Sequence, residues 1–252
     1  MQSSRMKLFL FILPPLVILI PCEPARAELF DILTSEVPPM AFTENGKLTG
    51  YCTEITEEIQ RRLHDKNPIE SIPWGRAYKM GLEQPRIMLD CPKRTPEREK
   101  LFKWVGPVVE SSTNLYRKRG TIPGVNSLAE ARKVPSVLVP RGFYSIQQLQ
   151  NLGFTNLEIV ADSEMAVRMV LRGRGSLIAL DRLQIPTALK QVQEPLESLE
   201  SIARVGPSNG YFAFSRDISD KTIRTWQKTL GQLRANGFLK RAYRKWFEEK
   251  SR

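Results

Sequence analysis

The chain has 252 residues, of which 41% are hydrophobic and 26% are charged. This length and composition predict one or two globular domains and exclude a disordered chain, a disulfide-dense miniprotein and a multispan membrane protein. Lysine and arginine outnumber aspartate and glutamate by 38 to 27, giving a net charge of +11. The single histidine, His64, excludes a metal site built from several histidines and argues against Ser-His-Asp chemistry.

The first 27 residues have the pattern of an export signal. Arg5 and Lys7 precede an uncharged stretch over 8–20, and Ala25-Arg26-Ala27 is a small-x-small cleavage pattern. The stretch is too short to span a bilayer, which takes about 20 apolar residues. We therefore expect a signal peptide over 1–27 and a mature periplasmic chain that begins at Glu28, with an uncleaved anchor as the alternative.

Short apolar runs then alternate with amphipathic helical segments, which is the pattern of an α/β protein. We expect strands over 29–34, 86–89, 134–139, 157–160 and 176–180. We expect helices over 53–64, 75–83, 145–152, 163–172 and 223–233, and a last short helix around 243–247. Asn45-Gly46 predicts a tight turn, and Ser145 and Ser163 are the expected N-caps of their helices.

Two polar, partly extended segments, 111–119 and 203–212, separate the α/β runs. If both connect the same two lobes, the chain crosses twice between domains. Such a double crossing is the geometry of a hinge.

Two cysteines, Cys52 and Cys91, remain after the expected signal. An even number of cysteines in an exported protein favours a disulfide, and two buried free thiols are the alternative. Two sulfurs without histidine partners make a weak case for zinc, so we expect no metal and no cofactor. The basic charge suits an anionic ligand, an anionic membrane face or solubility alone, and export makes nucleic acid an unsuitable partner.

The chain offers charges suited to holding a small ion rather than a nucleophile with its base. Lys93, Arg94 and Arg98 surround a turn in which Thr95 is the expected N-cap. An arginine at this turn can hold a carboxylate through two parallel hydrogen bonds. Asp181 follows a predicted strand at the edge where open α/β sheets bind ligands, and it could receive an ammonium group. Ordinary surface charge is the alternative for each of these residues.

Five segments in order carry a family resemblance. They are 37–42 with 46–51, Trp74-Gly75-Arg76-Ala77, Thr95-Pro96-Glu97-Arg98-Glu99 with Phe102 and Gly106-Pro107, 176–181, and 233–247. Together they resemble the bacterial extracellular solute-binding proteins of family 3, the periplasmic binding proteins of polar amino-acid ABC transporters. The resemblance covers nearly all of 28–247.

The resemblance implies a type II periplasmic-binding-protein fold, in which two α/β lobes are joined by two hinge crossovers. Lobe 1 would comprise 28–113 and 209–252, and lobe 2 would comprise 114–208. Ligand would lie in the cleft, and the lobes would close over it.

The resemblance also implies a site. Arg98 would hold an α-carboxylate, Asp181 would hold an α-amino group, and the turn at Gly142 would offer backbone amides. The expected apolar wall consists of Trp74, Met40 and Phe42. Thr95 and Lys93 complete the expected set.

This sequence departs from the family at two places. Lys93 stands where the family usually carries a small, often hydroxyl-bearing residue, and Cys52 stands where it often carries aspartate. A lysine in the site would add positive charge and remove an acceptor for an amino group, which puts an ordinary α-amino acid ligand in doubt. An acidic amino acid, another small carboxylate, a lost transport role and a Lys93 that points to solvent all stay open.

We therefore expect a non-enzymatic, monomeric receptor for a small polar or anionic solute that delivers it to an ABC permease. The first alternative is an enzyme on the same scaffold, similar to cyclohexadienyl dehydratase, with Glu110 or Asp181 as general acid. The second is a sensor or orphan binding module without a transporter.

Overall fold

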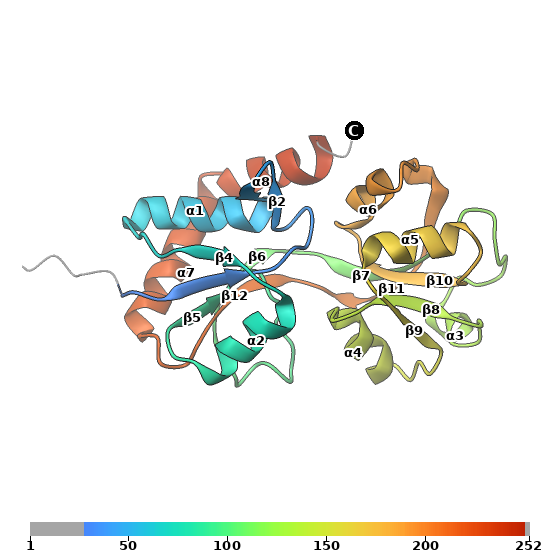
Figure 1. Cartoon of the computed structure of the whole chain (residues 1–252), viewed down its shortest axis with the longest axis horizontal. Helices are drawn as coiled ribbons and strands as arrows, with labels where there is room; N and C mark the ends of the chain where they lie inside the picture. The colour runs from blue at the N-terminus through green and yellow to red at the C-terminus, as the bar shows by residue number, and fades with distance from the viewer. Residues whose placement is uncertain (1–27, 250–252) are drawn as a thin grey trace, which may run out of the picture.

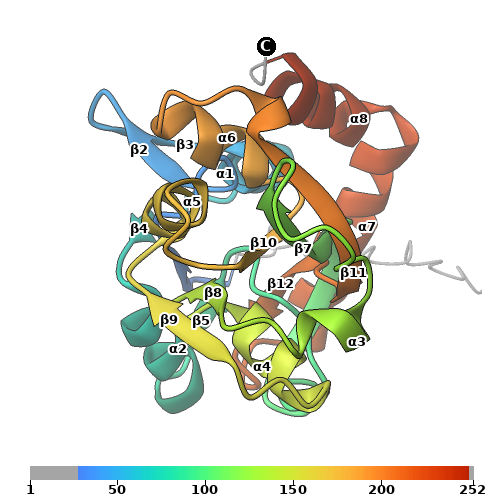
Figure 2. The same cartoon turned by 90° about the vertical axis from the view of Figure 1, so that its right-hand side faces the viewer.

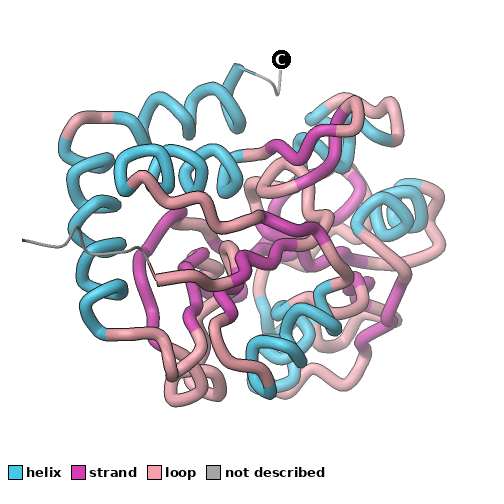
Figure 3. The backbone as a smooth tube through the Cα atoms, turned by 60° about the vertical axis from the view of Figure 1, so that its left-hand side comes forward, coloured by secondary structure: helices cyan, strands magenta, loops and turns pink. Residues whose placement is uncertain are grey.

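The computed structural model describes residues 28–249, so the expected signal peptide lies outside the described residues. Two five-stranded sheets organise these residues (Figure 1). The two-lobe α/β fold that the resemblance implied is confirmed. We call the parts built on the first and second sheets lobe 1 and lobe 2. Figure 3 shows the strands running through the interior, with helices outside them.

The sheet of lobe 1 is mostly parallel at one side and antiparallel at the other. Its strand order is β4 (Ile69–Ser71), β1 (Asp31–Thr34), β5 (Ile87–Leu89), β12 (Gly210–Phe214) and β6 (Lys103–Val109). A small hairpin of β2 (Phe42–Glu44) and β3 (Lys47–Thr49) turns at Asn45-Gly46, as expected.

Helices cover both faces of the lobe 1 sheet. They are α1 (Tyr51–Leu63), α2 (Trp74–Glu83), α7 (Asp220–Ala235) and α8 (Phe238–Tyr243), which continues as a π-helical segment, Arg244–Glu249. Neighbouring residues of a strand point to opposite faces. Accordingly Ile32 packs with Ile55 of α1 and Trp226 of α7, whereas Leu33 packs with Ala77 of α2 on the other face.

The sheet of lobe 2 has a parallel half and an antiparallel half. Its order is β11 (Leu199–Pro207), β7 (Ser112–Lys118), β10 (Leu177–Asp181), β8 (Val137–Pro140) and β9 (Leu157–Val160). Strands β8 and β10 are buried throughout, as expected of strands covered on both faces.

The helices of lobe 2 form two layers, with α5 and α6 on one face and α3 and α4 on the other (Figure 2). Their bounds are α3 (Leu128–Ala131), α4 (Tyr144–Asn151), α5 (Ser163–Leu171) and α6 (Ile185–Gln191), and a 3-10 turn follows at Leu196–Ser198. Within residues 28–249, no helix is both long and apolar enough to cross a membrane.

Two short connections join the lobes. The second lies within the singled-out segment 203–212, and the first begins one residue before the segment 111–119. One runs from β6 to β7 through residues 110–111, and the other from β11 to β12 through residues 208–209. They lie side by side, because the Ser208 amide donates to the Ser111 carbonyl at 2.9 Å. The second sheet begins at Ser112, and the expected lobe boundaries themselves remain a prediction.

The expected N-caps of two helices were wrong. Asp162, rather than Ser163, caps α5, because its side chain accepts from the Met165 amide at 2.8 Å. Helix α4 begins after Phe143 without a side-chain cap, and Ser145 lies inside its first turn. Because Ser145 does not cap α4, its hydroxyl is not used in a helix cap.

Candidate ligand-binding cleft

A cleft of about 750 Å³ lies between the two lobes. This volume is in the range of small-molecule sites. Several strands deliver their carboxyl ends to it: β1 ends at Thr34, β5 is followed by Asp90, β8 by Arg141, and β10 ends at Asp181. The carboxyl edge of an α/β sheet is where ligand sites form, and here two sheets turn such edges toward one space.

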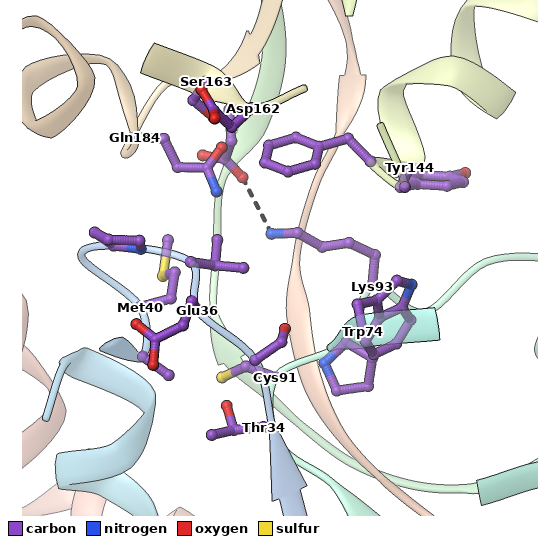
Figure 4. A pocket seen from close by; sticks show the side chains of 18 of the residues that line it. Thr34, Glu36, Met40, Trp74, Cys91, Lys93, Tyr144, Asp162, Ser163 and Gln184 are labelled. Atoms are coloured by element: carbon purple, nitrogen blue, oxygen red, sulfur yellow. Dashed lines mark hydrogen bonds and ion pairs between the residues drawn. The ribbon is translucent and has the colours of Figure 1, made fainter. Parts of the chain in front are cut away.

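Lys93 points into this cleft and joins the two lobes. Its ammonium donates to Asp181 Oδ2 at 3.1 Å, the contact that Figure 4 marks with a dashed line. It also donates to the Ser208 carbonyl at 2.6 Å. Its backbone pairs with Gly210 at the start of β12, which fixes the base of the side chain. Lys93 therefore faces the cleft rather than solvent, which the sequence left open.

Asp181 is surrounded by donors. Its Oδ1 atom accepts from the Ser111 hydroxyl and from the Leu183 amide, the latter at 3.0 Å. Burial alone would raise the pKa of Asp181, but the Lys93 ammonium and these hydrogen bonds outweigh it and hold the pKa below its ordinary value. Asp181 is therefore an ionised, fully partnered carboxylate.

Arg98 lines the cleft from the lobe 1 side, and its guanidinium packs against two aromatic rings. Its guanidinium carbon lies 5.3 Å from the ring centre of Trp74 and 4.9 Å from that of Tyr78. Within residues 28–249 its guanidinium makes one hydrogen bond, from Nη1 to the Lys93 carbonyl at 3.3 Å. A guanidinium has five N–H donors, so most remain for a ligand.

Trp74 and Gly142 face each other across the cleft. A methyl group added at Gly142 would lie 3.7 Å from Trp74 Cδ1, so the lobes come close here. Met40 also lines the cleft from lobe 1. Trp74, Gly142 and Met40 therefore line the cleft, and their roles toward a ligand remain a proposal.

Two expected site residues do not line the cleft. Phe42 was expected in the apolar wall, but its ring packs edge-to-face on Trp246, with ring centres 5.9 Å apart, because β2 turns that side chain into the core of lobe 1. Thr95 is buried beneath the turn, where its hydroxyl accepts from the Arg98 amide at 3.3 Å. Thr95 therefore holds the turn that carries Arg98 and has no surface in the cleft.

Four buried side-chain polar atoms of residues 28–249 have no hydrogen-bond partner, and three of them belong to residues that line this cleft. The three are Asp90 Oδ2, Ser145 Oγ and Gln184 Oε1, on residues that are 7%, 3% and 6% exposed. Buried polar atoms are nearly always partnered in folded proteins. The concentration of exceptions in one space indicates groups arranged for something that enters it.

The pKa of Asp90 is shifted in the opposite direction to those of Glu36 and Asp181, which are lowered. Burial raises its pKa to about 7, although the hydroxyls of Thr56 and Thr34 oppose the shift. The Thr56 hydroxyl donates to Oδ1 at 3.1 Å. Below neutral pH, Asp90 is therefore an uncharged acid that can donate a proton or a hydrogen bond into the cleft.

Cys52 and Cys91 form a disulfide in the structure, with their Cα atoms 6.2 Å apart. Cys52 is fully buried in the first turn of α1, and Cys91 lines the cleft. The bond thus ties the start of α1 to the segment that carries Asp90 and Lys93.

Sequence reasoning missed Asp90, Ser145 and Gln184 as cleft residues. Asp90 had a usable signal, since it follows an apolar strand as Asp181 does. Ser145 was assigned to a cap, and Gln184 lies in a helix start that was not predicted. Glu110, the expected alternative acid, lies outside the cleft lining, and its carbonyl accepts from Arg182.

The residues described offer no group of three or more His, Cys, Asp or Glu side chains that could hold a metal ion. The cleft instead presents fixed cations, a protonatable carboxyl and neutral polar groups. Such a set can bind a small polar solute.

Two α/β lobes, two adjacent crossovers and a polar cleft between them define a two-lobe solute-binding protein. The chain belongs to the bacterial extracellular solute-binding proteins of family 3, whose family model matches residues 32–249.

Two relatives from Bacillus subtilis (strain 168) are similar over most of their length. The probable amino-acid-binding protein YxeM is 25% identical over 231 residues, which cover 86% of this chain and 82% of that protein. The L-cystine-binding protein TcyA is 24% identical over 213 residues, covering 82% and 75%.

Solved structures share the fold. A histidine kinase sensor domain with similarity to periplasmic binding proteins superposes with a TM-score of 0.76 at 17% sequence identity, covering 87% of this chain and 96% of that one. At this identity the likeness concerns the fold alone.

Proposed function

We propose that this protein captures a small carboxylate-bearing solute in the inter-lobe cleft and closes over it. The observation that carries the proposal is the set of three buried, unpartnered polar atoms on residues that line one space between the lobes. A solute that contacts both lobes only in the closed state shifts the equilibrium toward closure. Arg98 would hold the carboxylate through its unused donors.

The proposal extends to export and delivery. The expected signal over 1–27 would place the mature chain in the periplasm, and the closed form would dock on an ABC permease as a monomer. The curated relatives are named as amino-acid-binding proteins, which supports a binding role for this chain.

A thermal-shift screen of the mature chain tests the proposal. The library should hold amino acids, their oxo and hydroxy analogues, dicarboxylates, amines and inorganic anions. A bound solute stabilises the folded state by mass action and so raises the melting temperature. At a concentration one hundred times its Kd, the free energy of unfolding rises by about 2.7 kcal/mol. A library in which no solute raises the melting temperature would contradict the proposal.

An enzyme on this scaffold is the second candidate, and Asp90 is the observation that favours it. A dehydratase needs a proton donor in the cleft. Asp181 is unsuited, because it is ionised and paired with Lys93, and Glu110 lies elsewhere. Asp90 is buried and protonatable near neutral pH, it lines the cleft, and its Oδ2 atom has no hydrogen-bond partner. Turnover of prephenate or arogenate, followed by product absorbance and lost in Asp90→Asn, would establish this candidate.

A further inference from the structure

We propose that the solute carries an oxygen, as a keto or hydroxyl group, and not an ammonium group on the carbon next to its carboxylate. The inference rests on the proposed function and names the class of solute: small 2-oxo or 2-hydroxy carboxylates. The feature that carries it is the Lys93–Asp181 pair at the base of the cleft, where the protein supplies its own ammonium group.

Asp181 already has an ammonium partner. Its two oxygens accept from the Lys93 ammonium, the Ser111 hydroxyl and the Leu183 amide. The residue is only 5% exposed, so a competing ligand would have to displace Lys93 from a buried carboxylate. Such a displacement would leave the Lys93 ammonium, which is only 22% exposed, without its carboxylate partner and close to the ligand's own positive charge.

Lys93 also presents hydrogen-bond donors to a ligand, where a free carboxylate would present acceptors. An ammonium group has three N–H donors, and two of these are used by Asp181 and the Ser208 carbonyl. Arg98 Nη1 donates to the Lys93 carbonyl, so the Arg98 guanidinium lies next to the backbone of Lys93. A ligand therefore meets the remaining donor of Lys93 and the unused donors of Arg98 in one region of the cleft. Next to the carboxylate, the ligand therefore needs an acceptor.

The other carboxyl groups of the cleft do not offer a substitute for Asp181. Glu36 accepts from both the amide and the hydroxyl of Thr43 and from Ser71. Asp162 caps α5, and Glu164 pairs with Arg168 along the same helix. Asp90 keeps its proton up to about pH 7 and so carries little charge to attract an ammonium.

The neutral polar groups of the cleft fit an oxygen-bearing ligand. The Ser145 hydroxyl and the protonated Asp90 can donate to a keto oxygen, and Gln184 Oε1 can accept from a ligand hydroxyl. A neutral amide oxygen is a weak receptor for a full positive charge held beside Lys93. The like charges of Lys93 and an α-ammonium group would repel one another at close range.

Calorimetric titration of the mature protein with matched solutes tests the inference. Each set differs only at the carbon next to the carboxylate: aspartate with malate and oxaloacetate, alanine with lactate and pyruvate, and leucine with its 2-oxo and 2-hydroxy analogues. We expect an oxygen-bearing member of at least one set to bind at least tenfold more tightly than its amino acid.

Two variants locate the cause of this preference. Lys93→Ser frees Asp181 and adds a hydroxyl acceptor, so the preference should move toward the amino acid by at least tenfold. Lys93→Met also removes the ammonium group while filling much of the same space, so it should move the preference in the same direction and keeps the inference testable if Lys93→Ser fails to fold. Lys79→Ser, a matched change at an exposed position on α2, should leave the preference unchanged.

The outcomes separate this inference from the function on which it rests. An amino acid that binds the unaltered protein as tightly as its analogues, or a preference that Lys93→Ser does not move, overturns the inference and leaves a solute-binding function intact. Binding of none of these sets, alongside stabilisation by another solute in the wider screen, has the same meaning. Failure of every solute in that screen overturns both.

Discussion

Arg98 shows how single side chains prepare this cleft before any solute arrives. Its guanidinium lies over Trp74 and Tyr78, and the Thr95 hydroxyl holds the backbone of its turn. A guanidinium held against rings loses less side-chain freedom on binding than one that moves in solvent, which favours affinity.

Removal of this guanidinium should abolish tight carboxylate binding. Each charge-assisted hydrogen bond contributes about 1.5–3 kcal/mol, so the loss of a two-bond contact in Arg98→Ala should weaken affinity at least 100-fold. Arg98→Lys keeps the charge without the planar guanidinium, so its affinity should lie between those of the unaltered protein and of Arg98→Ala. Calorimetry with any solute found by screening measures the effect.

Arg94→Ala is the matched control for this experiment. Arg94 lies on the same turn and also contacts rings, those of Trp104 and Tyr211, but it pairs with Glu99 and is outside the cleft lining. Equal losses of affinity in Arg94→Ala and Arg98→Ala would show that the turn as a whole, rather than the Arg98 guanidinium, supports binding.

Asp90 should make the stability of the protein depend on pH. Its pKa is about 7 in the folded protein and about 3.8 when unfolded. Between these values the folded state holds a proton that the unfolded state has lost, so stability falls as pH rises, by at most about 4 kcal/mol. Asp90→Asn should remove this fall. Chemical unfolding at pH 5, 6, 7 and 8 compares the two proteins, and parallel curves would contradict the assignment.

The sequence could predict which charged residues belong to the site, but it could not predict their ion pairing or their protonation. Arg98 and Asp181 follow local rules, since one lies in a capped turn and the other at a strand end. The pairing of Lys93 with Asp181 joins residues 88 positions apart, and the raised pKa of Asp90 depends on burial by several elements. Phe42 was misplaced because one position in a short hairpin decides whether a ring faces core or cleft.

At the scale of elements, the buried strands and amphipathic helices followed from their patterns. β8 and β10 are continuous apolar runs, and α1 and α7 present apolar residues on one face. β6 was missed because Gly106-Pro107 interrupts it, and pairing with β12 restores the strand. Such pairing joins segments far apart in the chain, so a local pattern does not contain it.

Gly50 holds the junction between the hairpin and α1 against the loop that carries Met40. Its φ of +125° suits glycine, and an added Cβ would overlap the Met40 carbonyl oxygen. Gly50→Ala should therefore destabilise the protein and shift Met40 at the cleft wall. Gly75→Ala, in α2 with open space around it, should be neutral or stabilise by up to about 1 kcal/mol. Unfolding midpoints measure both.

The Cys52–Cys91 bond closes a stretch of chain with a separation of 39 residues. On the chain-entropy model, removing a cross-link that closes a loop of this size should lower the free energy of unfolding by about 4 kcal/mol. The double variant Cys52→Ala/Cys91→Ala should unfold at lower denaturant and should also bind solute more weakly, because Cys91 lies between Asp90 and Lys93. Reduced wild-type protein is the control. Unchanged affinity in both would show that the bond supports the fold without shaping the cleft.

At the scale of the molecule, the two crossovers explain how a cleft can open and close without breaking either core. Each lobe has its own sheet, and the buried clusters lie within one lobe except that Leu183, which follows β10, packs with the cluster of lobe 1. Within residues 28–249, residues 110–111 connect β6 to β7 and residues 208–209 connect β11 to β12. The sequence indicated this arrangement through two polar segments separated by a full α/β unit. It could not place Lys93 at the pivot, where its ammonium contacts both Asp181 of lobe 2 and the Ser208 crossover.

A solute that bridges the lobes should make the molecule more compact. Small-angle X-ray scattering should show the radius of gyration falling on saturation toward about 17 Å, the value for a compact chain of this size. The cause is that contacts from Arg98 on one side and from the groups near Gly142 and Gln184 on the other are satisfied together only when the lobes approach. Arg98→Ala at the same solute concentration should keep the radius of the unliganded protein. A radius unchanged by a solute that calorimetry shows to be bound would place binding in a cleft that is already closed, and lobe movement would then play no part in capture.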